Sequence, residues 1–501
     1  MITLSEKMNI LFIMTDQQRA DHLSCYGNRT LKTPHIDSIA ENNGVRFSNY
    51  YCNTPICMPN RANFFTGCYP SVHGTRSNGI NLDENNITIS EVLREKGYHT
   101  ISIGKTHFNF YAPSSIRNVH SKEDLTFWMD GSTPDIFTTP YYGFNEVYLT
   151  IGHGDVMGGH YYNWLKKKDP SISQKLKNRF LKLNDYFYET EVPEELYPSN
   201  YITEQTVKFL ERYDQGEYSD KPFFMHCSYN DPHHPVCPPG KYKELYDPQK
   251  IILPENFNDS KNLLEHPFLG PHLKDKRFKQ LLPQNIDEET AKKFLALTYG
   301  SISMIDDGVG RILNTLSKTG LEKNTMVIFT TDHGDLGANH GLILKGPAHY
   351  RGLINIPLLW KVPGITKRSV SSSLVSTIDL TRTLYNLLRI RKKDLPPTLQ
   401  GYDITPILKD PGKEVRDHIL IEHDEELSKD KIMRLRTIIT KTHRLTLYDG
   451  HDYGDLFDLK RDPYEQKNLW DNKDLRNKMV ERLLREIIKL HPRYPPRAAF
   501  N

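Results

Sequence analysis

Residues 57–67 of this chain read C-M-P-N-R-A-N-F-F-T-G and contain residue types that could carry out chemistry. A free cysteine such as Cys57 is most often a small buried hydrophobic residue. A cysteine one helical turn from an arginine can instead be a nucleophile, because a nearby cation favours its reactive thiolate form. Arg61 itself could form a surface ion pair, or its guanidinium could reach the reacting group and an anion bound there.

Two pairs of potential metal ligands occur far apart in the sequence. Asp16 and Gln17 follow one short apolar run, and Asp332 and His333 follow another. Carboxylates suit Ca²⁺ or Mg²⁺, and an added imidazole widens the choice toward Mn²⁺ or Zn²⁺. Each aspartate could also cap a helix that follows a strand. The run Asp332-His333-Gly334, in a chain that also carries residues 57–61, favours the metal site.

Lys105 and His107 form a second candidate group, in the run G-K-T-H. Because side chains two positions apart on a strand point the same way, both can face one site. Lysine supplies a point charge for the oxygens of an anion, and histidine can orient or take up a proton. A lone histidine is usually structural, but its spacing from Lys105 favours a functional role. Asn78 could donate to the anion or simply shape a turn.

Short apolar runs alternate with amphipathic stretches through most of the chain. This alternation predicts an α/β fold with a mostly parallel sheet covered on both faces. The predicted strands are residues 9–15, 100–103, 223–229 and 325–331, and the predicted helices are residues 36–42, 90–96, 203–213 and 289–316. Asp16, Lys105, residues 231–234 and residues 332–333 each follow a predicted strand. Ligands bind beyond the carboxyl ends of parallel strands, so these residues should share one crevice.

Two regions depart from this pattern. Residues 112–200 are rich in aromatic residues, glycine and proline, which predicts an insertion with long loops that shapes a substrate pocket. Residues 419–422, 434–440 and 444–448 alternate as antiparallel strands do. A helix should follow, with one buried stripe of Leu475, Met479, Leu483 and Ile487. We therefore expect a catalytic domain over residues 1–410 and a small α+β subdomain over residues 411–501.

Composition narrows the classes of partner. The formal net charge of +3 gives no case for nucleic acid as the main partner. The six cysteines are sparse and lack C-x-x-C spacing, which indicates neither a zinc framework nor a disulfide scaffold. The amino-terminal apolar run is shorter than that of a secretory signal, and no segment approaches the roughly 20 apolar residues of a membrane span. We expect a cytoplasmic protein with no membrane partner.

Taken in order, these motifs resemble those of the type I sulfatases, which belong to the alkaline-phosphatase superfamily. The match runs from residue 9 to about residue 469. It comprises C-x-P-x-R with the later Thr-Gly, G-Y-H-T and G-K-T-H at 97–107, D-P-H-H-P at 231–235, D-H-G at 332–334, and the stretch from 458 to 469. The pairs Asp16-Gln17 and Asp332-His333 are most similar to phosphonate monoester hydrolases and choline-sulfatase-type members. Thr106 and Asn60 replace residues that are more frequent in the family.

The resemblance implies cofactors and roles. Cys57 would be oxidised by a formylglycine-generating or equivalent maturation enzyme, and its aldehyde hydrate would be the nucleophile. One divalent cation, first of all Ca²⁺ with Mg²⁺ or Mn²⁺ as alternatives, would be held by Asp16, Asp332, His333 and the modified Cys57. His233 would be an acid on the substrate side, with His234 packing beside it.

Lys345 would contact a sulfate oxygen or the leaving alcohol, and Gln17, Asn78 and Lys105 would complete the substrate contacts. One hydroxyl of the hydrate would attack sulfur, and deprotonation of the other would eject sulfate. The expected reaction is hydrolysis of a small anionic sulfate ester. A phosphonate monoester or phosphodiester hydrolase with the same site is one rival, and a non-catalytic binding protein with an unconverted Cys57 is another. Assays with aryl sulfate and aryl phosphonate esters separate the two hydrolases.

Overall fold

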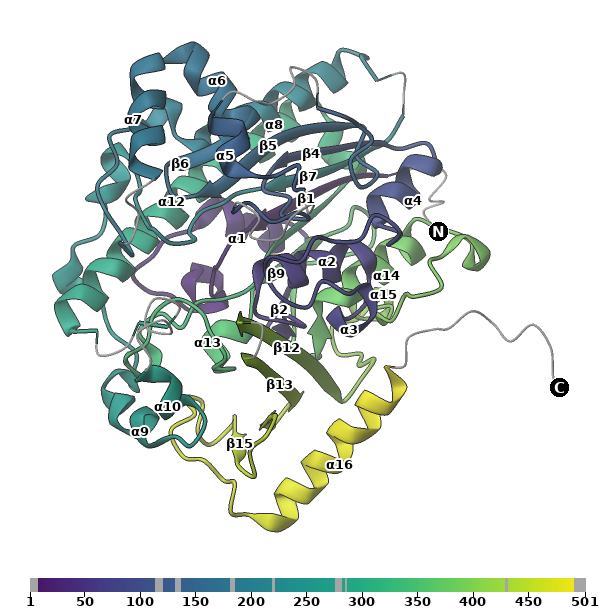
Figure 1. The fold of residues 1–501 in the computed structure, drawn as a ribbon. Coiled ribbons are helices and arrows are strands. Elements are labelled where there is room, and N and C mark those ends of the chain that lie inside the picture. The colour runs from purple at the N-terminus through teal and green to yellow at the C-terminus, as the bar shows by residue number, and fades with distance from the viewer. Residues whose placement is uncertain are drawn as a thin grey trace.

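Strand β1, Asn9–Thr15, is buried along its whole length and lies in the middle of a nine-stranded sheet (Figure 1). The computed structural model describes residues 8–490 except 113–119, 131–136, 181–184, 219–220, 275–281, 284–285 and 429–430. The strand order is β10-β2-β9-β8-β1-β7-β4-β5-β6. Strands β8, β1, β7, β4 and β5 run parallel to one another, so their carboxyl ends meet at one edge.

The remaining strands of this sheet close its two sides. β9 is antiparallel to both β8 and β2, β10 is parallel to β2, and β6 is antiparallel to β5. The bounds are β2 Gly44–Phe47, β4 His99–Gly104, β5 Glu146–His153, β6 Val156–Gly159, β7 Phe223–Ser228, β8 Thr325–Thr331, β9 Leu358–Lys361 and β10 Ser369–Ser371. Two short strands, β3 Tyr50–Tyr51 and β11 Val375–Ser376, pair separately.

Helices cover both faces of the sheet, as alternating side chains show. On one face Phe12 of β1 stacks on Phe64 with ring centroids 4.0 Å apart, and His226 of β7 lies 5.0 Å from Phe65. On the other face Cys227 accepts from Thr206 at 3.3 Å. The helices are α1 Pro34–Glu41, α2 Cys57–Thr66, α3 Pro70–His73, α4 Ile89–Glu95, α5 Leu125–Met129, α6 His160–Lys168, α7 Pro170–Phe180, α8 Pro198–Asp214, α9 Ser260–Glu265, α10 Leu269–Leu273, α12 Glu288–Lys318, α13 Arg351–Ile354, α14 Thr377–Leu387, α15 Thr405–Lys409 and α16 Lys473–Lys489. No helix within the described residues is long and apolar enough to cross a membrane.

A second, antiparallel sheet of four strands follows. Its order is β12-β13-β14-β15, with bounds His418–Ser428, Lys431–Thr440, His443–Tyr448 and Gly454–Asp458. One face carries Ile421 and Leu435 into the main core, and the other packs Ile438 and Leu445 against α16. The smaller sheet is therefore buried on both faces. Its strands carry apolar residues on both faces, so a pattern of alternating buried and exposed residues fits them only in part.

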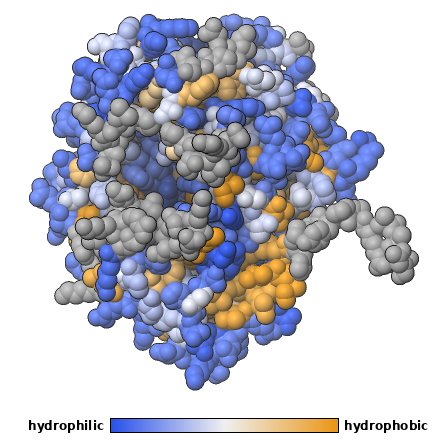
Figure 2. Space-filling view, viewed as in Figure 1, coloured by the Kyte–Doolittle hydropathy of each residue, from blue (hydrophilic) through white to orange (hydrophobic). Residues whose placement is uncertain are grey.

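The α/β architecture with a mostly parallel sheet is confirmed, and so are the eight strands and helices predicted for the catalytic region. The expectation of a loop-rich insertion at 112–200 was wrong in one respect, because this region supplies β5 and β6 to the main sheet. The expected stripe on α16 is shorter than predicted, since Met479 and Leu483 are buried but Ile487 is 37% exposed. Figure 2 shows hydrophobic surface beside the last turns of this helix. The domain boundary at residue 410 stays a prediction.

Candidate active site

The carboxyl edge of the parallel strands gathers the candidate residues. Asp16 follows β1, Lys105 follows β4, and Asp332 follows β8. His153 is the last residue of β5. The loop after β7 adds residues 229–234, and its Asp231 carbonyl accepts from the Asp16 backbone N–H at 3.2 Å. The candidate residues therefore gather at one edge of the sheet, as the sequence predicts.

Cys57 is the first residue of α2 and is only 1% exposed. Its Sγ lies 2.9 Å from Lys345 Nζ, 3.0 Å from His333 Nε2 and 3.9 Å from Asp16 Oδ1. Burial opposes the thiolate, but the charges of Lys345, Lys105 and His333 together outweigh it and hold the pKa of the Cys57 thiol below its ordinary value. The N-terminus of a helix also favours negative charge. The position is thus built for an anionic or electron-rich group.

Arg61 lies one turn further along α2 and is fully buried. Its Nε donates to Asp332 Oδ2 at 2.8 Å, and its Nη1 donates to Lys105 O and Ser228 Oγ, both at 2.8 Å. Its Nη2 lies 3.9 Å from Asp16 Oδ2 and has no hydrogen-bond partner among the described residues. The surface ion pair considered for Arg61 is therefore excluded, because the guanidinium joins two buried carboxylates.

The orientation of His333 fixes which ring nitrogen faces the site. Nδ1 lies 2.9 Å from the Gly334 carbonyl oxygen, which can only accept, so Nδ1 carries the proton. Nε2 faces Cys57 Sγ and lies 3.6 Å from Asp16 Oδ1, where in the neutral ring its lone pair can bind a cation. Asp332 Oδ1 accepts from the backbone N–H groups of Gln17 at 3.1 Å and His333 at 2.8 Å. These supporting bonds orient a first coordination shell in the way metal sites require.

The residues present fit a divalent cation. Ligand atoms of Asp16, Cys57, Asp332 and His333 all lie within 4.8 Å of one another, and all four residues are buried. Burial raises the pKa of the Asp16 carboxyl, but the charges of Lys105, Arg61 and Lys345 outweigh burial and hold it well below its ordinary value. An ionised carboxylate is the form that binds a metal. Two carboxylates and an imidazole suit Ca²⁺, Mg²⁺ or Mn²⁺.

Lys105 and His107 both lie at this site, although β4 ends at Gly104 and the two residues are in the following loop. Lys105 Nζ donates to Asp16 Oδ2 and to His153 Nε2, the latter at 2.8 Å. His107 adopts a left-handed backbone with φ 55°. Its Nδ1 is buried and finds no hydrogen-bond partner in the described part of the chain. Arg61 Nη2 and His107 Nδ1 are therefore polar atoms left for a ligand or a modified side chain.

His233 and Lys345 are in direct contact. Lys345 Nζ lies 2.7 Å from His233 Nε2 and 3.2 Å from His333 Nε2. Burial first, and then the charge on Lys345, hold the pKa of His233 well below its ordinary value, so its ring is neutral near pH 7. His234 stacks on His233 at 4.2 Å and contacts the Gln17 amide, consistent with the packing role expected for it.

Gln17 and Asn78 are placed differently from the other candidates. The Gln17 amide donates to Asp335 Oδ2 at 2.6 Å and contacts His234 Nδ1 at 3.1 Å. Asn78 is exposed, and its Oδ1 accepts from the backbone N–H of Met58 at 3.1 Å. The structure thus uses Asn78 to hold a turn against α2, one of the two roles considered. Direct substrate contact by either side chain stays a prediction.

Three residues of the site were missed from the sequence: Glu123, His153 and Asp335. Glu123 is 2% exposed and accepts from five groups around the loop that carries His107. Asp335 accepts from Gln17 and from the Gly337 and Leu344 backbones. His153 ends a strand, so the rule that identified Lys105 would have found it had residues 146–153 been recognised as a strand. Glu123 has no comparable local signal.

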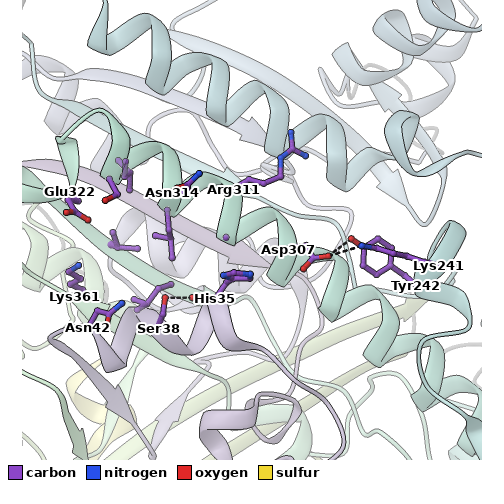
Figure 3. Close-up of a pocket in the computed structure, with 16 residues that line it drawn as sticks. His35, Ser38, Asn42, Lys241, Tyr242, Asp307, Arg311, Asn314, Glu322 and Lys361 are labelled. Atoms are coloured by element: carbon purple, nitrogen blue, oxygen red, sulfur yellow. Dashed lines mark hydrogen bonds and ion pairs between the residues drawn. The ribbon is translucent and has the colours of Figure 1, made fainter.

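A large cavity lies away from this chemistry. It measures about 820 Å³ and is lined by α1, α12 and the start of β8, at the amino edge of the sheet (Figure 3). There Asp307 accepts from Tyr242 Oη at 2.6 Å and pairs with Lys241, while His35 lies across the groove. The lining is polar and of mixed charge, and it shares no residue with the cluster around Cys57.

Comparison with known proteins agrees with the geometry. The sulfatase family profile matches residues 8–390, and the N-sulphoglucosamine sulphohydrolase C-terminal profile matches residues 339–492. The chain is 30% identical over 484 residues to the uncharacterized sulfatase YidJ of Escherichia coli K12, covering 96% of this chain and 87% of that protein. It is 28% identical to an arylsulfatase of Clostridium perfringens, covering 96% and 94%.

Among solved structures, the phosphonate monoester hydrolase of Agrobacterium radiobacter superposes with a TM-score of 0.77 at 22% identity, over 96% of this chain and 95% of that one. At that identity the likeness shows the fold alone. Fold and site together define a hydrolase of the alkaline-phosphatase type, with a buried metal-ligand cluster beside a cysteine. The chain belongs to the sulfatase family and is a sulfatase enzyme. Membership implies a divalent metal and a modified cysteine.

Proposed function

We propose that this enzyme hydrolyses the sulfate ester of a small anionic substrate to an alcohol and inorganic sulfate. Cys57, oxidised to formylglycine by a maturation enzyme, would supply the nucleophile. Asp16, Asp332 and His333 would hold one divalent cation, with Ca²⁺ as the first candidate. The observation that supports this most directly is the position of Cys57 Sγ, which lies in the same four-ligand cluster and 2.9 Å from Lys345 Nζ.

The hydrated aldehyde supplies two hydroxyls on one carbon, one to attack sulfur and one whose deprotonation drives the release of sulfate. A divalent cation held by Asp16, Asp332 and His333 would supply Lewis-acid chemistry that lowers the pKa of a hydrate hydroxyl. The chain's own contribution is to hold these groups. Arg61 keeps Asp16 and Asp332 together, and its free Nη2 can donate to a hydrate oxygen. His107, with Nδ1 unpartnered, is the candidate to accept the hydrate proton.

Two lysines form the candidate anion clamp. Lys105 and Lys345 are both within hydrogen-bonding distance of the groups around Cys57, and both are buried or half-buried. Preorganised cations in a water-poor site bind a developing anionic charge strongly. His233 Nε2 accepts from Lys345 Nζ, so the Lys345 ammonium can supply a proton for the leaving alcohol through His233. These roles assign the three residues to anion binding and leaving-group protonation.

A second function is supported by the character of the metal site. Gln17 is neutral where a second carboxylate would add negative charge. A sulfate monoester and a phosphonate monoester each carry one negative charge on a tetrahedral centre near neutral pH, so the same clamp suits both. The second candidate is therefore hydrolysis of a phosphonate monoester or phosphodiester through the same residues.

The test combines chemistry at Cys57 with turnover. Mass spectrometry of the tryptic peptide covering residues 47–61 should show an aldehyde in place of the thiol. Hydrolysis of 4-nitrophenyl sulfate should exceed that of 4-nitrophenyl phenylphosphonate, and Cys57→Ala should abolish both. A higher kcat/KM for the phosphonate would select the second candidate. An unmodified thiol in protein made with its maturation enzyme, together with no turnover of either ester, would refute both.

A further inference from the structure

His153 lies at the carboxyl end of β5, beside the strand that leads to Lys105. Because β4 and β5 are parallel neighbours, their ends bring Lys105 and His153 to the same place. The side chain of His153 is 12% exposed, so it is a wall of the site rather than part of the deep core. Tyr111 packs edge-on against its ring, with centroids 5.3 Å apart, and limits its rotation.

The first contact of His153 sets its protonation pattern. Lys105 Nζ lies 2.8 Å from His153 Nε2. An ammonium group has three N–H donors and no acceptor, so the imidazole nitrogen must accept. A second N–H of Lys105 is donated to Asp16. One N–H remains, and the two partners fix its direction.

The second contact connects His153 to the opposite lysine. The rings of His153 and His233 stack with centroids 3.6 Å apart and planes inclined by 8°. His233 Nε2 in turn lies 2.7 Å from Lys345 Nζ. Two stacked imidazoles therefore each accept from one lysine, and we name these four residues the lysine–imidazole bracket. The bracket helps to set the spacing of two ammonium groups that repel each other and are carried on flexible stems.

We propose that His153 is a positioning residue that fixes the free N–H of Lys105 toward the bound anion and holds the ring plane of His233. This inference rests on the proposed function, because it takes Lys105 to bind the anion and His233 to serve the leaving group. Without the acceptor at His153, the salt bridge to Asp16 is the remaining constraint on the Lys105 ammonium. Without the ring of His153, His233 loses one of its stacking partners.

Two variants separate these effects. His153→Phe keeps an aromatic ring over His233 but removes the acceptor for Lys105. His153→Gln keeps an acceptor oxygen but removes the ring. Loss of a hydrogen bond to a charged group should lower binding or rate on the order of tenfold to a hundredfold, and loss of an aromatic pair should lower it about twofold to tenfold. We expect His153→Phe to raise KM and His153→Gln mainly to lower kcat. The matched control is His451→Phe, at an exposed histidine in the turn between β14 and β15.

Anion binding provides a readout that does not depend on turnover. Calorimetric titration with inorganic sulfate should give an affinity for His153→Phe that is lower by on the order of tenfold or more. His153→Gln should bind sulfate nearly as tightly as the unsubstituted enzyme, and thermal melting should show all variants folded. Equal sulfate affinity in His153→Phe and the unsubstituted enzyme would overturn the inference, as would failure of the unsubstituted enzyme to bind sulfate. Sulfate binding that depends on His153 in an enzyme that turns over neither ester would instead leave this inference standing and refute the proposed function.

Discussion

Replacing Glu123 by Gln should damage catalysis far more than stability. The carboxylate of Glu123 holds the loop that follows Lys105. Its Oε1 accepts from Thr106 Oγ1 and Tyr141 Oη and from two backbone N–H groups, whereas its Oε2 accepts from the backbone N–H of His107 at 2.9 Å. A glutamine can keep the four bonds to Oε1. Its amide nitrogen would then face the His107 N–H, and two donors cannot bond to each other.

The expected size of each effect follows from this geometry. Burial raises the pKa of Glu123, so removing its charge relieves a desolvation cost that offsets part of the lost bonding. We therefore expect a stability loss of about 1–2 kcal/mol, the cost of one buried N–H left without a partner. His107 has a left-handed backbone with φ 55°, a conformation that residues other than glycine rarely adopt. The contacts of the loop must therefore hold His107 in this conformation. A displacement of about 1 Å in a catalytic group costs on the order of 100-fold in rate.

The assay compares kcat/KM for 4-nitrophenyl sulfate with the unfolding midpoint in urea, for Glu123→Gln and for Glu123→Ala. Glu123→Ala leaves all five donors unpaired and should lose on the order of 5 kcal/mol or more, so its activity loss reflects misfolding. The control is Glu84→Gln, at an exposed glutamate that pairs with Lys122 at the surface. A Glu123→Gln enzyme with unchanged kcat/KM would refute the positioning of His107 by this carboxylate. A loss of several kcal/mol in Glu123→Gln would show that the charge itself is needed.

Four further predictions follow from other parts of the site. Arg61→Lys keeps the positive charge but loses the separate N–H directions of the guanidinium, which leaves Asp332 poorly paired. The free energy of unfolding in urea should therefore fall by about 3 kcal/mol. An unchanged free energy of unfolding would contradict the bridging role of Arg61. His349→Phe removes the 3.0 Å hydrogen bond to His423, which joins the loop that carries Lys345 to the smaller sheet. KM should rise in steady-state assays, whereas the formylglycine content measured by mass spectrometry should stay the same. Burial raises the pKa of Asp231 to about 7, so this residue binds more protons in the folded protein than in the unfolded chain. Its contribution to the free energy of unfolding therefore falls as pH rises from about 4 to 7. Asp231→Asn should flatten this part of the stability curve by up to about 4 kcal/mol, measured by urea unfolding at several pH values. Removal of divalent ions with a chelator should abolish turnover reversibly. Addition of Ca²⁺ at 100-fold above its dissociation constant should restore about 2.7 kcal/mol of stability in thermal melts. Full activity of the chelated enzyme without added metal would contradict a metal-dependent site.

Much of the fold could be predicted because its signals are local. The apolar run at Asn9–Thr15 and the long amphipathic stretch at Glu288–Lys318 were both found at nearly their observed bounds. A polar residue directly after a buried run is visible in the sequence, which is how Asp16 and Asp332 were identified. The main error was at residues 146–153, where a tyrosine, a threonine and a glycine interrupt the apolar pattern. In the structure that segment is β5.

The roles of single side chains were harder to predict. Gln17 and Asn78 look alike as polar residues in motifs, yet one bonds to Asp335 and the other to the backbone of α2. These partners depend on loop conformation, including the left-handed backbone at Gln17 with φ 58°. No periodicity in the sequence encodes such a conformation. The orientation of an amide side chain follows from the neighbours that the fold supplies.

The resemblance to the type I sulfatases pointed to Lys345. The sequence pattern alone predicted the class of fold, the order of its elements and Cys57, Arg61 and Asp332 as candidate site residues. Residue type and spacing along the chain are enough for these, because they depend on strand and helix periods. Only the tertiary structure decided that His153 accepts from Lys105 and that Glu123 holds His107. The reason is physical: the order of strands in a sheet and the path of the loops beyond it are set by packing between distant segments. That packing brings together groups such as Gln17 and Asp335, which lie 318 residues apart in the chain.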